Sequence, residues 1–291
     1  MLKRLRVLIS PAILLLTYLP ASTSVNEKDS VFLSGSLWYN LELYEVYCPY
    51  ELHGEGDFLW LFDSDQSCYK LDIRTKEIVH VFSLSGCSKM PVRLHGENVC
   101  ALITENPTIQ RYTVKNGQSN LVCLPKVCSY IDFAVYDKEL FIVADDSEYL
   151  YRLINHDGEI VRNGRLRTEN AGEVSCIEYN VQNDILAIVS PRYIEIVKTT
   201  NDVLKTTIHL DHCMDVIVSE KNIYALCPYF SDNPKENQNS SLHVFDLEGK
   251  LLKIYVLDTR ICKFSLLADD KVLYGLTLEE ELPIVKFELE R

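Results

Sequence analysis

The segment YIDFAVYDKELFIVADDSEYLYRLINHDGEIVRNGRL, residues Tyr130–Leu166, contains four short apolar stretches separated by polar residues. The apolar stretches are rich in Val, Ile, Tyr and Phe, which favour extended structure. Asp, Asn and Gly lie between them, as is typical of hairpin turns. The segment therefore predicts four consecutive antiparallel strands, namely Tyr130–Tyr136, Glu139–Ala144, Tyr149–Asn155 and Glu159–Leu166.

A leucine ends this segment and recurs at the end of similar segments along the chain. Its copies are Leu43, Leu84, Leu124, Leu166, Leu210 and Leu257. Successive copies are separated by 40 to 47 residues. A repeat of about 40–45 residues with four strands is typical of a β-propeller blade. The sequence therefore predicts an all-β fold with four-stranded antiparallel blades around a central channel.

The repeat is incomplete at both ends of the chain. After Leu257 the sequence contains three strands, Lys263–Leu267, Val272–Thr277 and Ile284–Leu289, and no fourth. Val31–Leu43 ends in the recurring leucine without preceding strands of its own. We expect this N-terminal stretch to be the outer strand of the last blade, because closure of the ring removes exposed sheet edges. The predicted fold is one six-bladed propeller over residues 25–291.

The first 24 residues have the composition of a signal peptide. Lys3, Arg4 and Arg6 precede an apolar stretch from Val7 to Leu19, and small residues follow up to Ser24. The apolar stretch is shorter than the ~20 residues that a membrane-spanning helix needs. We expect export to the periplasm or the extracellular medium, with no transmembrane segment left after cleavage.

The composition narrows the class of partner. The 291 residues carry a formal net charge of −13, and 47% of them are hydrophobic, which is ordinary for a globular protein. A strongly acidic surface repels phosphate backbones. We therefore do not expect a nucleic acid as partner.

The last third of the chain resembles a known family. Its sequence includes SLHVFDLEGK (Ser241–Lys250), LLKIYVL (Leu251–Leu257), VLYGLT (Val272–Thr277) and a terminal IVKFEL (Ile284–Leu289). This pattern is similar to that of the TolB-like six-bladed propellers common among exported Bacteroidetes proteins. The resemblance implies a propeller and export, and it supplies no catalytic motif. Members often carry a lipid-modified cysteine at the cleavage site, whereas the first cysteine here is Cys48.

Charged residues mark the predicted channel mouth. When the first strands of adjacent blades are aligned, three acidic residues share one position and the last blade offers a lysine, namely Asp132, Glu178, Asp215 and Lys263. Converging carboxylates could bind a cation such as Ca²⁺, recognise an amine, or act as general acid and base. The alternative that needs no ligand is that water solvates these residues at the ends of the inner strands.

Cysteines and histidines also recur with the blades. A cysteine lies near the start of each first strand, namely Cys48, Cys87, Cys128, Cys176, Cys213 and Cys262. Cys123 and Cys128 could form a disulfide, although buried free thiols are equally compatible with the repeat. His53 and His95 stand in two copies of Leu-His-Gly-Glu, and we expect both in turns between first and second strands.

The sequence thus predicts an exported binding or scaffolding propeller. Its partner would be a protein or a carbohydrate, bound at the channel mouth or at an exposed loop formed by the insertion Pro228–Ser241. No catalytic motif is identified, so the sequence favours a binding module over an enzyme and leaves catalysis open. The alternative is a metal-dependent hydrolase or lyase that uses Asp132, Glu178 and Asp215 at the channel mouth.

Overall fold

The computed structural model describes most of the repeat region. The described residues are 30–41, 46, 48–84, 91–96, 98–103, 108–124, 130–136, 139–144, 149–156, 159–167, 174–200, 203–229, 239–277 and 284–289. The predicted signal peptide lies outside these ranges, and so do Leu43, Cys87, Cys128 and residues 230–238 of the insertion. No helix in this part of the chain is long and apolar enough to cross a membrane.

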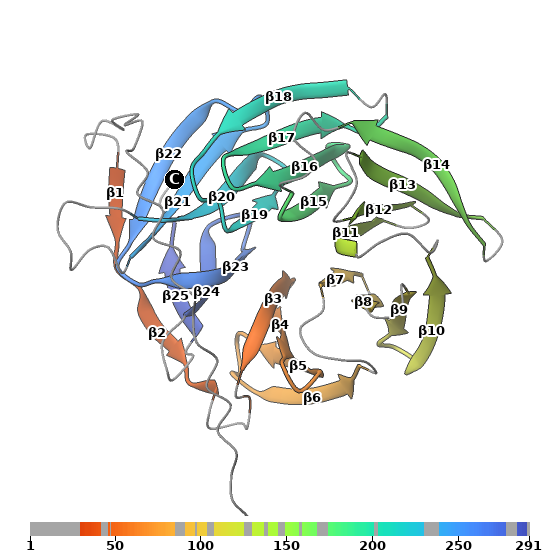
Figure 1. Ribbon diagram of the computed structural model, residues 1–291. Helices are drawn as coiled ribbons and strands as arrows, with labels where there is room; N and C mark the ends of the chain where they lie inside the picture. Colours follow the sequence, from red (N-terminus) through yellow and green to blue (C-terminus); the bar gives the residue numbers. More distant parts are fainter. Residues whose placement is uncertain are drawn as a thin grey trace, which may run out of the picture.

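The described strands form six hydrogen-bonded sheets arranged in a ring (Figure 1). Four of these sheets are each built from one continuous segment of the chain, with their strands in sequence order from the channel outward. The first sheet contains β3 (Pro49–Glu55), β4 (Phe58–Asp63), β5 (Ser67–Asp72) and β6 (Ile78–Ser83), and the second contains β7 (Val92–His95), β8 (Asn98–Ile103), β9 (Thr108–Thr113) and β10 (Gln118–Cys123). The third contains β11 (Tyr130–Tyr136), β12 (Glu139–Ala144), β13 (Tyr149–His156) and β14 (Glu159–Arg167). The fourth contains β15 (Cys176–Asn180), β16 (Ile185–Ser190), β17 (Tyr193–Lys198) and β18 (Val203–His209).

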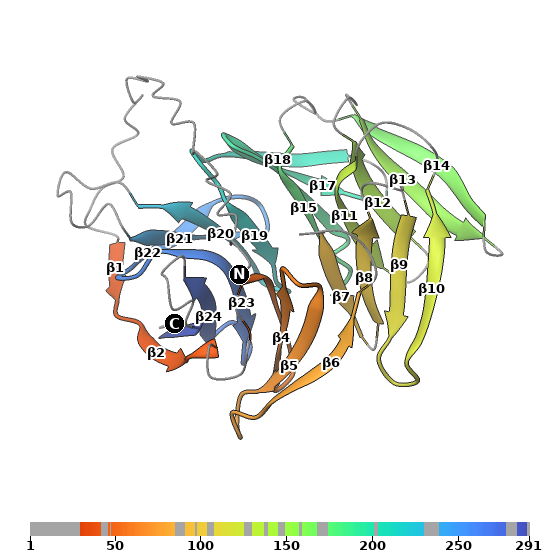
Figure 2. The same ribbon diagram turned by 60° about the horizontal axis from the view of Figure 1, so that its bottom comes forward.

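The two remaining sheets take up strands from the N-terminal stretch. One contains β19 (Asp215–Val218), β20 (Asn222–Pro228), β21 (Ser240–Asp246) and β22 (Leu251–Leu257), with β1 (Ser30–Leu33) parallel to β22 as a fifth strand. The other contains β23 (Ile261–Leu267), β24 (Val272–Thr277) and β25 (Ile284–Glu288), with β2 (Ser36–Tyr39) antiparallel to β25. Figure 2 shows β1 and β2 in succession along the outside of the ring.

The structure confirms the predicted four-stranded blade, but not all blades have the same number of strands. Five of the six sheets in the described part of the chain have four antiparallel strands, as the repeat predicts, while the sheet of β19–β22 has five. The N-terminal stretch closes the last sheet through β2, as expected. The prediction of one outer strand over Val31–Leu43 was wrong in its extent, because the chain divides into two strands that join two different sheets.

Three hydrogen bonds between Asp258 and residues 33–35, here called the Asp258 clasp, explain this division. Asp258 lies in the link between β22 and β23, and its carboxylate accepts hydrogen bonds from Ser34 Oγ at 2.6 Å and from the Gly35 amide at 2.8 Å. Its own amide donates to Leu33 O at 3.1 Å. A Cβ atom at Gly35 would overlap the side chain of Val285, so only glycine allows the chain to pass this close to β25. The clasp ends β1 and redirects the chain into β2.

The core lies between neighbouring sheets. All six residues of β16 are buried, because apolar side chains on both of its faces pack against adjacent sheets. Three of the recurring leucines are buried at or just after the end of the fourth strand of their blade, namely Leu84, Leu124 and Leu257. In these three blades the repeated leucine therefore belongs to the core.

The structure corrects the prediction for His53. The sequence places this residue in a turn, but it lies inside β3 and pairs with Trp60 of β4. The turn comes later, at Gly56, which has a positive φ of 60°. Because β3 extends further than expected, the His53 side chain is positioned on the channel rather than at the molecular surface.

Candidate functional site

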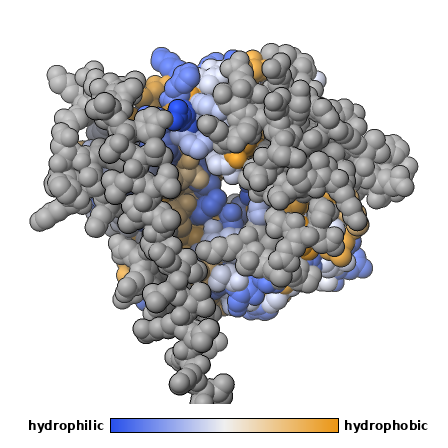
Figure 3. All heavy atoms as spheres, in the orientation of Figure 1, coloured by the Kyte–Doolittle hydropathy of each residue, from blue (hydrophilic) through white to orange (hydrophobic). Residues whose placement is uncertain are grey.

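Polar and charged side chains converge where the inner strands meet. Figure 3 shows an opening in the middle of the ring with hydrophilic residues around it. A pocket of about 260 Å³ lies there, lined by residues of β3, β7, β15, β19 and β23. Its charged lining residues are Glu51, Glu55, Arg93, Glu178, Asp215 and Lys263.

Arg93 of β7 is the centre of one ion-pair cluster. Its Nη2 lies 2.6 Å from Asp132 Oδ2 and donates to Ile177 O at 3.2 Å, while Nη1 donates to Val92 O at 2.8 Å. The Ile177 amide donates to the same Asp132 oxygen at 2.9 Å. Glu178 Oε2 is further away, at 4.0 Å from Arg93 Nε. This cluster therefore ties together β7, β11 and β15.

Burial and charge act in opposite directions within the Arg93 cluster. Burial alone would lower the pKa of Arg93, but the carboxylates of Asp132 and Glu178 raise it above its ordinary value. Burial raises the pKa of Asp132, whereas Arg93 and the Ile177 amide act to lower it. With a guanidinium at 2.6 Å and a backbone donor on the same oxygen, the ionised carboxylate is the form that this geometry stabilises.

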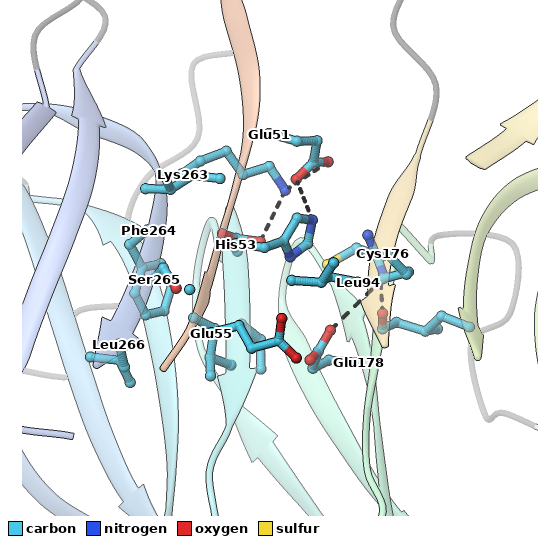
Figure 4. A pocket seen from close by; sticks show the side chains of 17 residues that line it. Glu51, His53, Glu55, Leu94, Cys176, Glu178, Lys263, Phe264, Ser265 and Leu266 are labelled. Carbon is cyan, nitrogen blue, oxygen red and sulfur yellow. Dashed lines mark hydrogen bonds and ion pairs between the residues drawn. The ribbon is translucent and has the colours of Figure 1, made fainter. Parts of the chain in front are cut away.

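Lys263 of β23 is the centre of a second cluster, shown in Figure 4. Its Nζ lies 3.1 Å from Asp215 Oδ1 and 3.5 Å from Glu51 Oε1. His53 Nε2 is 3.8 Å from Glu51 Oε2 and 3.1 Å from Val92 O. A carbonyl oxygen can only accept, so Nε2 of His53 carries the proton. This second cluster joins β23, β19 and β3.

The titratable groups of the second cluster respond to the same two effects. Burial lowers the pKa of His53 to about 3, and the nearby positive charges of Arg93 and Lys263 add to this, so the imidazole is neutral. Burial raises the pKa of Glu51, while Lys263 acts in the opposite direction. Burial alone would lower the pKa of Lys263, but Asp215 and Glu51 raise it. The lysine is therefore charged, as is required for both ion pairs.

Glu178 differs from the carboxylates that are held in ion pairs. Its side chain is 33% exposed, and Figure 4 shows its carboxyl group turned toward the same part of the pocket as that of Glu55. Burial raises the pKa of Glu178 to about 7; Arg93 opposes this, and Asp215 adds to it. Near neutral pH, this carboxyl group is therefore able to bind or release a proton.

The residues expected at the channel mouth lie on four inner strands around the channel. Glu178, Asp215 and Lys263 line the pocket, while Asp132 lies behind Arg93 and is 3% exposed. Their role in ligand binding stays a prediction.

The arrangement does not fit the calcium site considered from the sequence. Asp132 and Asp215 are held by Arg93 and Lys263, whose positive charges repel a second cation. The described residues contain no group of three His, Cys, Asp or Glu side chains that could hold a metal ion. A general acid and base built from the same carboxylates meets the same obstacle, because two of the three are held in ion pairs.

Sequence reasoning missed Arg93, Glu51 and the position of His53. A signal was present, since Glu51 and Arg93 stand directly before the two copies of Leu-His-Gly-Glu. This repeat therefore marks two inner strands that carry opposite charges. Their partners could not be read from the same pattern, because Asp132 and Asp215 lie on other blades.

Among the described cysteines, Cys123 is an exposed free thiol on β10. Its predicted partner Cys128 lies outside the described residues, so their disulfide stays a prediction. Cys176 contributes to the pocket, and burial raises the pKa of its thiol, which keeps it protonated.

Comparison with known proteins supports the fold. No protein-family model and no curated protein matches this sequence. A solved structure of the mitotic checkpoint complex contains a chain with a TM-score of 0.56 and 13% identity, covering 81% of this chain and 72% of that chain. A chain of a nidogen–laminin complex has a TM-score of 0.53 and 14% identity, covering 72% and 85% respectively. The computationally designed Ika8 protein has a TM-score of 0.50 and 11% identity, covering 83% and 71%. At these identities the similarity shows a β-propeller fold.

Proposed function

We propose that this protein is an exported binding propeller that recognises a protein partner through the central pocket. The observation that carries the proposal is the pocket itself, which lies where five of the six inner strands meet and is lined by a charged side chain from each of these five. Clusters of ion pairs hold these strands in a defined arrangement. A concave, preformed site with a few converging polar groups is the usual form of a binding site.

Two further observations favour a protein over a carbohydrate. Phe264 is the only phenylalanine, tyrosine or tryptophan among the lining residues, and it is 2% exposed, so it offers no face on which a sugar ring could stack. Two of the similar solved structures are those of protein complexes. The catalytic alternative has less support, because Asp132 and Asp215 are engaged by Arg93 and Lys263.

The same proposal has three further parts: the blades are six and share a repeat, the protein is related to the TolB-like propellers, and it is exported. They rest on the leucine repeat, on the pattern of the last third and on the composition of residues 1–24. N-terminal sequencing of the protein recovered outside the cytoplasm tests the export part. We expect the mature chain to begin at Val25, and a product that retains residues 1–24 inside the cell contradicts export.

Selection from a displayed random-peptide library tests the binding function, with a glycan array in parallel. The purified mature chain is compared with Glu178→Arg, which places a long positive side chain in the pocket, and with Glu248→Arg on the surface as the matched control. We expect peptides that bind the wild type and the control and lose at least tenfold in affinity for Glu178→Arg. Peptides that bind all three proteins equally, or binding on the glycan array alone, would overturn the proposal.

A further inference from the structure

Two cysteines of one blade lie opposite each other at the start of its inner strand. The Met214 amide donates to Leu226 O at 2.8 Å, although the register partner of Leu226 is Asp215. Met214 and Asp215 therefore share one opposing residue, which is the arrangement of a β-bulge. The residue before this bulge is Cys213, and it stands opposite Cys227, the residue that follows Leu226 on β20.

The same irregularity in other blades supports this register. The inner strands β3, β11 and β23 each shift their pairing by one residue at the same place, near the start of the strand. The pairs that precede the shift are Pro49 with Asp63, Tyr130 with Ala144, and Ile261 with Thr277. Of these described pairs and that of β19 with β20, only the last consists of two cysteines, so it is a feature of one blade rather than of the repeat.

The two thiols are in contact inside the core. Cys213 is 7% exposed and Cys227 is 2% exposed, and both belong to the apolar cluster between the sheet of β15–β18 and the sheet of β19–β22. The thiols of the two residues are in hydrogen-bond contact, and Cys213 Sγ also donates to Asp215 O at 3.6 Å. Side chains of directly opposite residues point to the same face of a sheet, which accounts for this contact.

Opposite positions on antiparallel strands suit a covalent link between cysteines. The Cα atoms of such residues are about 4.5–5.5 Å apart. Two cysteines can be joined without movement of the backbone when their Cα atoms are roughly 4.4–6.8 Å apart. The strands of this blade therefore already hold Cys213 and Cys227 at a suitable separation.

We infer that Cys213 and Cys227 form a disulfide that fixes the start of β19 against the end of β20. The oxidant is itself a disulfide, such as oxidised glutathione or a disulfide-donating protein. One cysteine attacks it as a thiolate and releases one of its sulfurs as a thiol, and the second cysteine attacks the mixed disulfide and releases the other. The chain loses two electrons and two protons, and the oxidant gains both as two thiols.

This inference goes beyond the proposed function. It takes from that proposal only the export, which brings the chain into a compartment where disulfides form and persist. Its test is made on the purified chain and depends neither on export nor on a partner. A failure of the disulfide therefore leaves the proposed binding function standing, and a failure of binding leaves the disulfide standing.

The disulfide would lie directly beside the pocket. Asp215 comes two residues after Cys213, and its carboxylate accepts a hydrogen bond from Lys263 Nζ at 3.1 Å. A link at Cys213 restricts the backbone that carries Asp215, so it holds one side of the pocket in place. Cys176 lines the pocket, but its register partner on β16 is Val189, so the pairing of the strands favours Cys227 as the partner of Cys213.

The surroundings of Cys213 determine when the bond can form. The contact with Cys227 and burial raise the pKa of Cys213 well above its ordinary value, so its thiol is protonated in the folded chain. Because the thiolate is the attacking form, oxidation of the folded chain is slow. We expect the bond to form during folding, and we expect the folded, reduced chain to acquire it at least tenfold more slowly than the chain that refolds with the oxidant.

Disulfide mapping tests the bond. The mature chain is reduced, unfolded and refolded with a mixture of oxidised and reduced glutathione. Remaining thiols are alkylated in denaturant, and the unreduced digest is analysed by mass spectrometry. We expect the peptides of Cys213 and Cys227 to be joined in most chains and to separate after reduction. Recovery of both as alkylated thiols, or joining of Cys213 mainly to Cys176, would overturn the inference.

Paired variants test whether the bond fixes the strand. We expect the oxidised wild type to unfold about 5–10 °C above its reduced form. The variant Cys213→Ala/Cys227→Ala should unfold at the same temperature in both redox states. Cys68→Ala is the control and keeps the shift, because Cys68 is a buried thiol whose register partners are Phe62 and Phe82. A shift that persists in the double variant, or no shift in the wild type, contradicts the fixing of β19. If the double variant does not fold, the wild-type shift and the disulfide map decide the question.

Discussion

Both ion-pair clusters of the channel place one cation near two carboxylates, but they differ in the cation and in the number and length of its contacts. Each has one cation near two carboxylates from other strands. Arg93 makes its contacts at 2.6–3.2 Å, two of them to backbone carbonyls, and its side chain is 14% exposed. Lys263 contacts its carboxylates at 3.1 and 3.5 Å, and its side chain is 24% exposed. A planar guanidinium with several donors can bind backbone and carboxylate together, whereas an ammonium is a point charge. Both clusters therefore join strands, but the first does so through more and shorter contacts than the second.

Removal of the Arg93 charge should have the largest effect on the free energy of unfolding, and it tests the difference between the two clusters. Arg93→Met leaves the Asp132 carboxylate buried without its cation, and we expect the free energy of unfolding to fall by about 3–5 kcal/mol. Urea unfolding followed by circular dichroism measures the loss. The double variant Arg93→Met/Asp132→Leu removes both charges and should recover most of it. A loss below about 1 kcal/mol in Arg93→Met would show that this cluster does not join the strands.

The equivalent change at Lys263 should cost less. Lys263→Met leaves Asp215 and Glu51 without a cation, but both side chains are more exposed than that of Asp132, and burial raises the pKa of Glu51, which favours its neutral form. We expect a loss of about 1–2 kcal/mol in the free energy of unfolding. Urea unfolding measures this loss. A loss as large as that of Arg93→Met would remove the distinction between the clusters.

The pKa of Glu178 is influenced by charged groups of both clusters, namely Arg93, Asp132, Asp215 and Lys263. This pKa is about 7 in the folded chain against an ordinary value of 4.5, so the folded state binds more protons between these pH values. Stability contributed by this group is present at low pH and is lost as the pH rises from about 4.5 to 7. With solvent screening of a partly exposed side chain, we expect a decrease of about 1–2 kcal/mol. Glu178→Gln removes this part of the pH dependence, and an unchanged stability–pH profile would contradict the assignment.

The smallest effect is expected at His53. Because the imidazole is neutral and donates one hydrogen bond to Val92 O, His53→Gln retains a donor and alters no charge. We expect a change of about 1 kcal/mol or less in the free energy of unfolding, with no new pH dependence between 5 and 8. A pH-dependent difference between wild type and variant in this interval would show that His53 carries charge.

Much of the blade architecture could be predicted because its contacts are local. The predicted bounds of β11, β12 and β24 agree with the structure, since each strand pairs with a strand next to it in the sequence and its own apolar residues specify it. The division of the N-terminal stretch could not be predicted. It depends on Asp258, whose carboxylate contacts Ser34 across 224 residues of sequence.

Most strands, the period of the blade and the place of the candidate charges on inner strands could be predicted from the sequence. These follow from residue type, turn composition and the recurring leucine, which act over a few residues. Which charges meet depends on the packing of distant strands against one another. Arg93 and Asp132 are 39 residues apart and Lys263 and Asp215 are 48 apart, on strands that become neighbours when the blades are arranged around the channel. The same packing pairs Asp132 with Arg93 and Asp215 with Lys263, and burial raises the pKa of Glu178 to about 7.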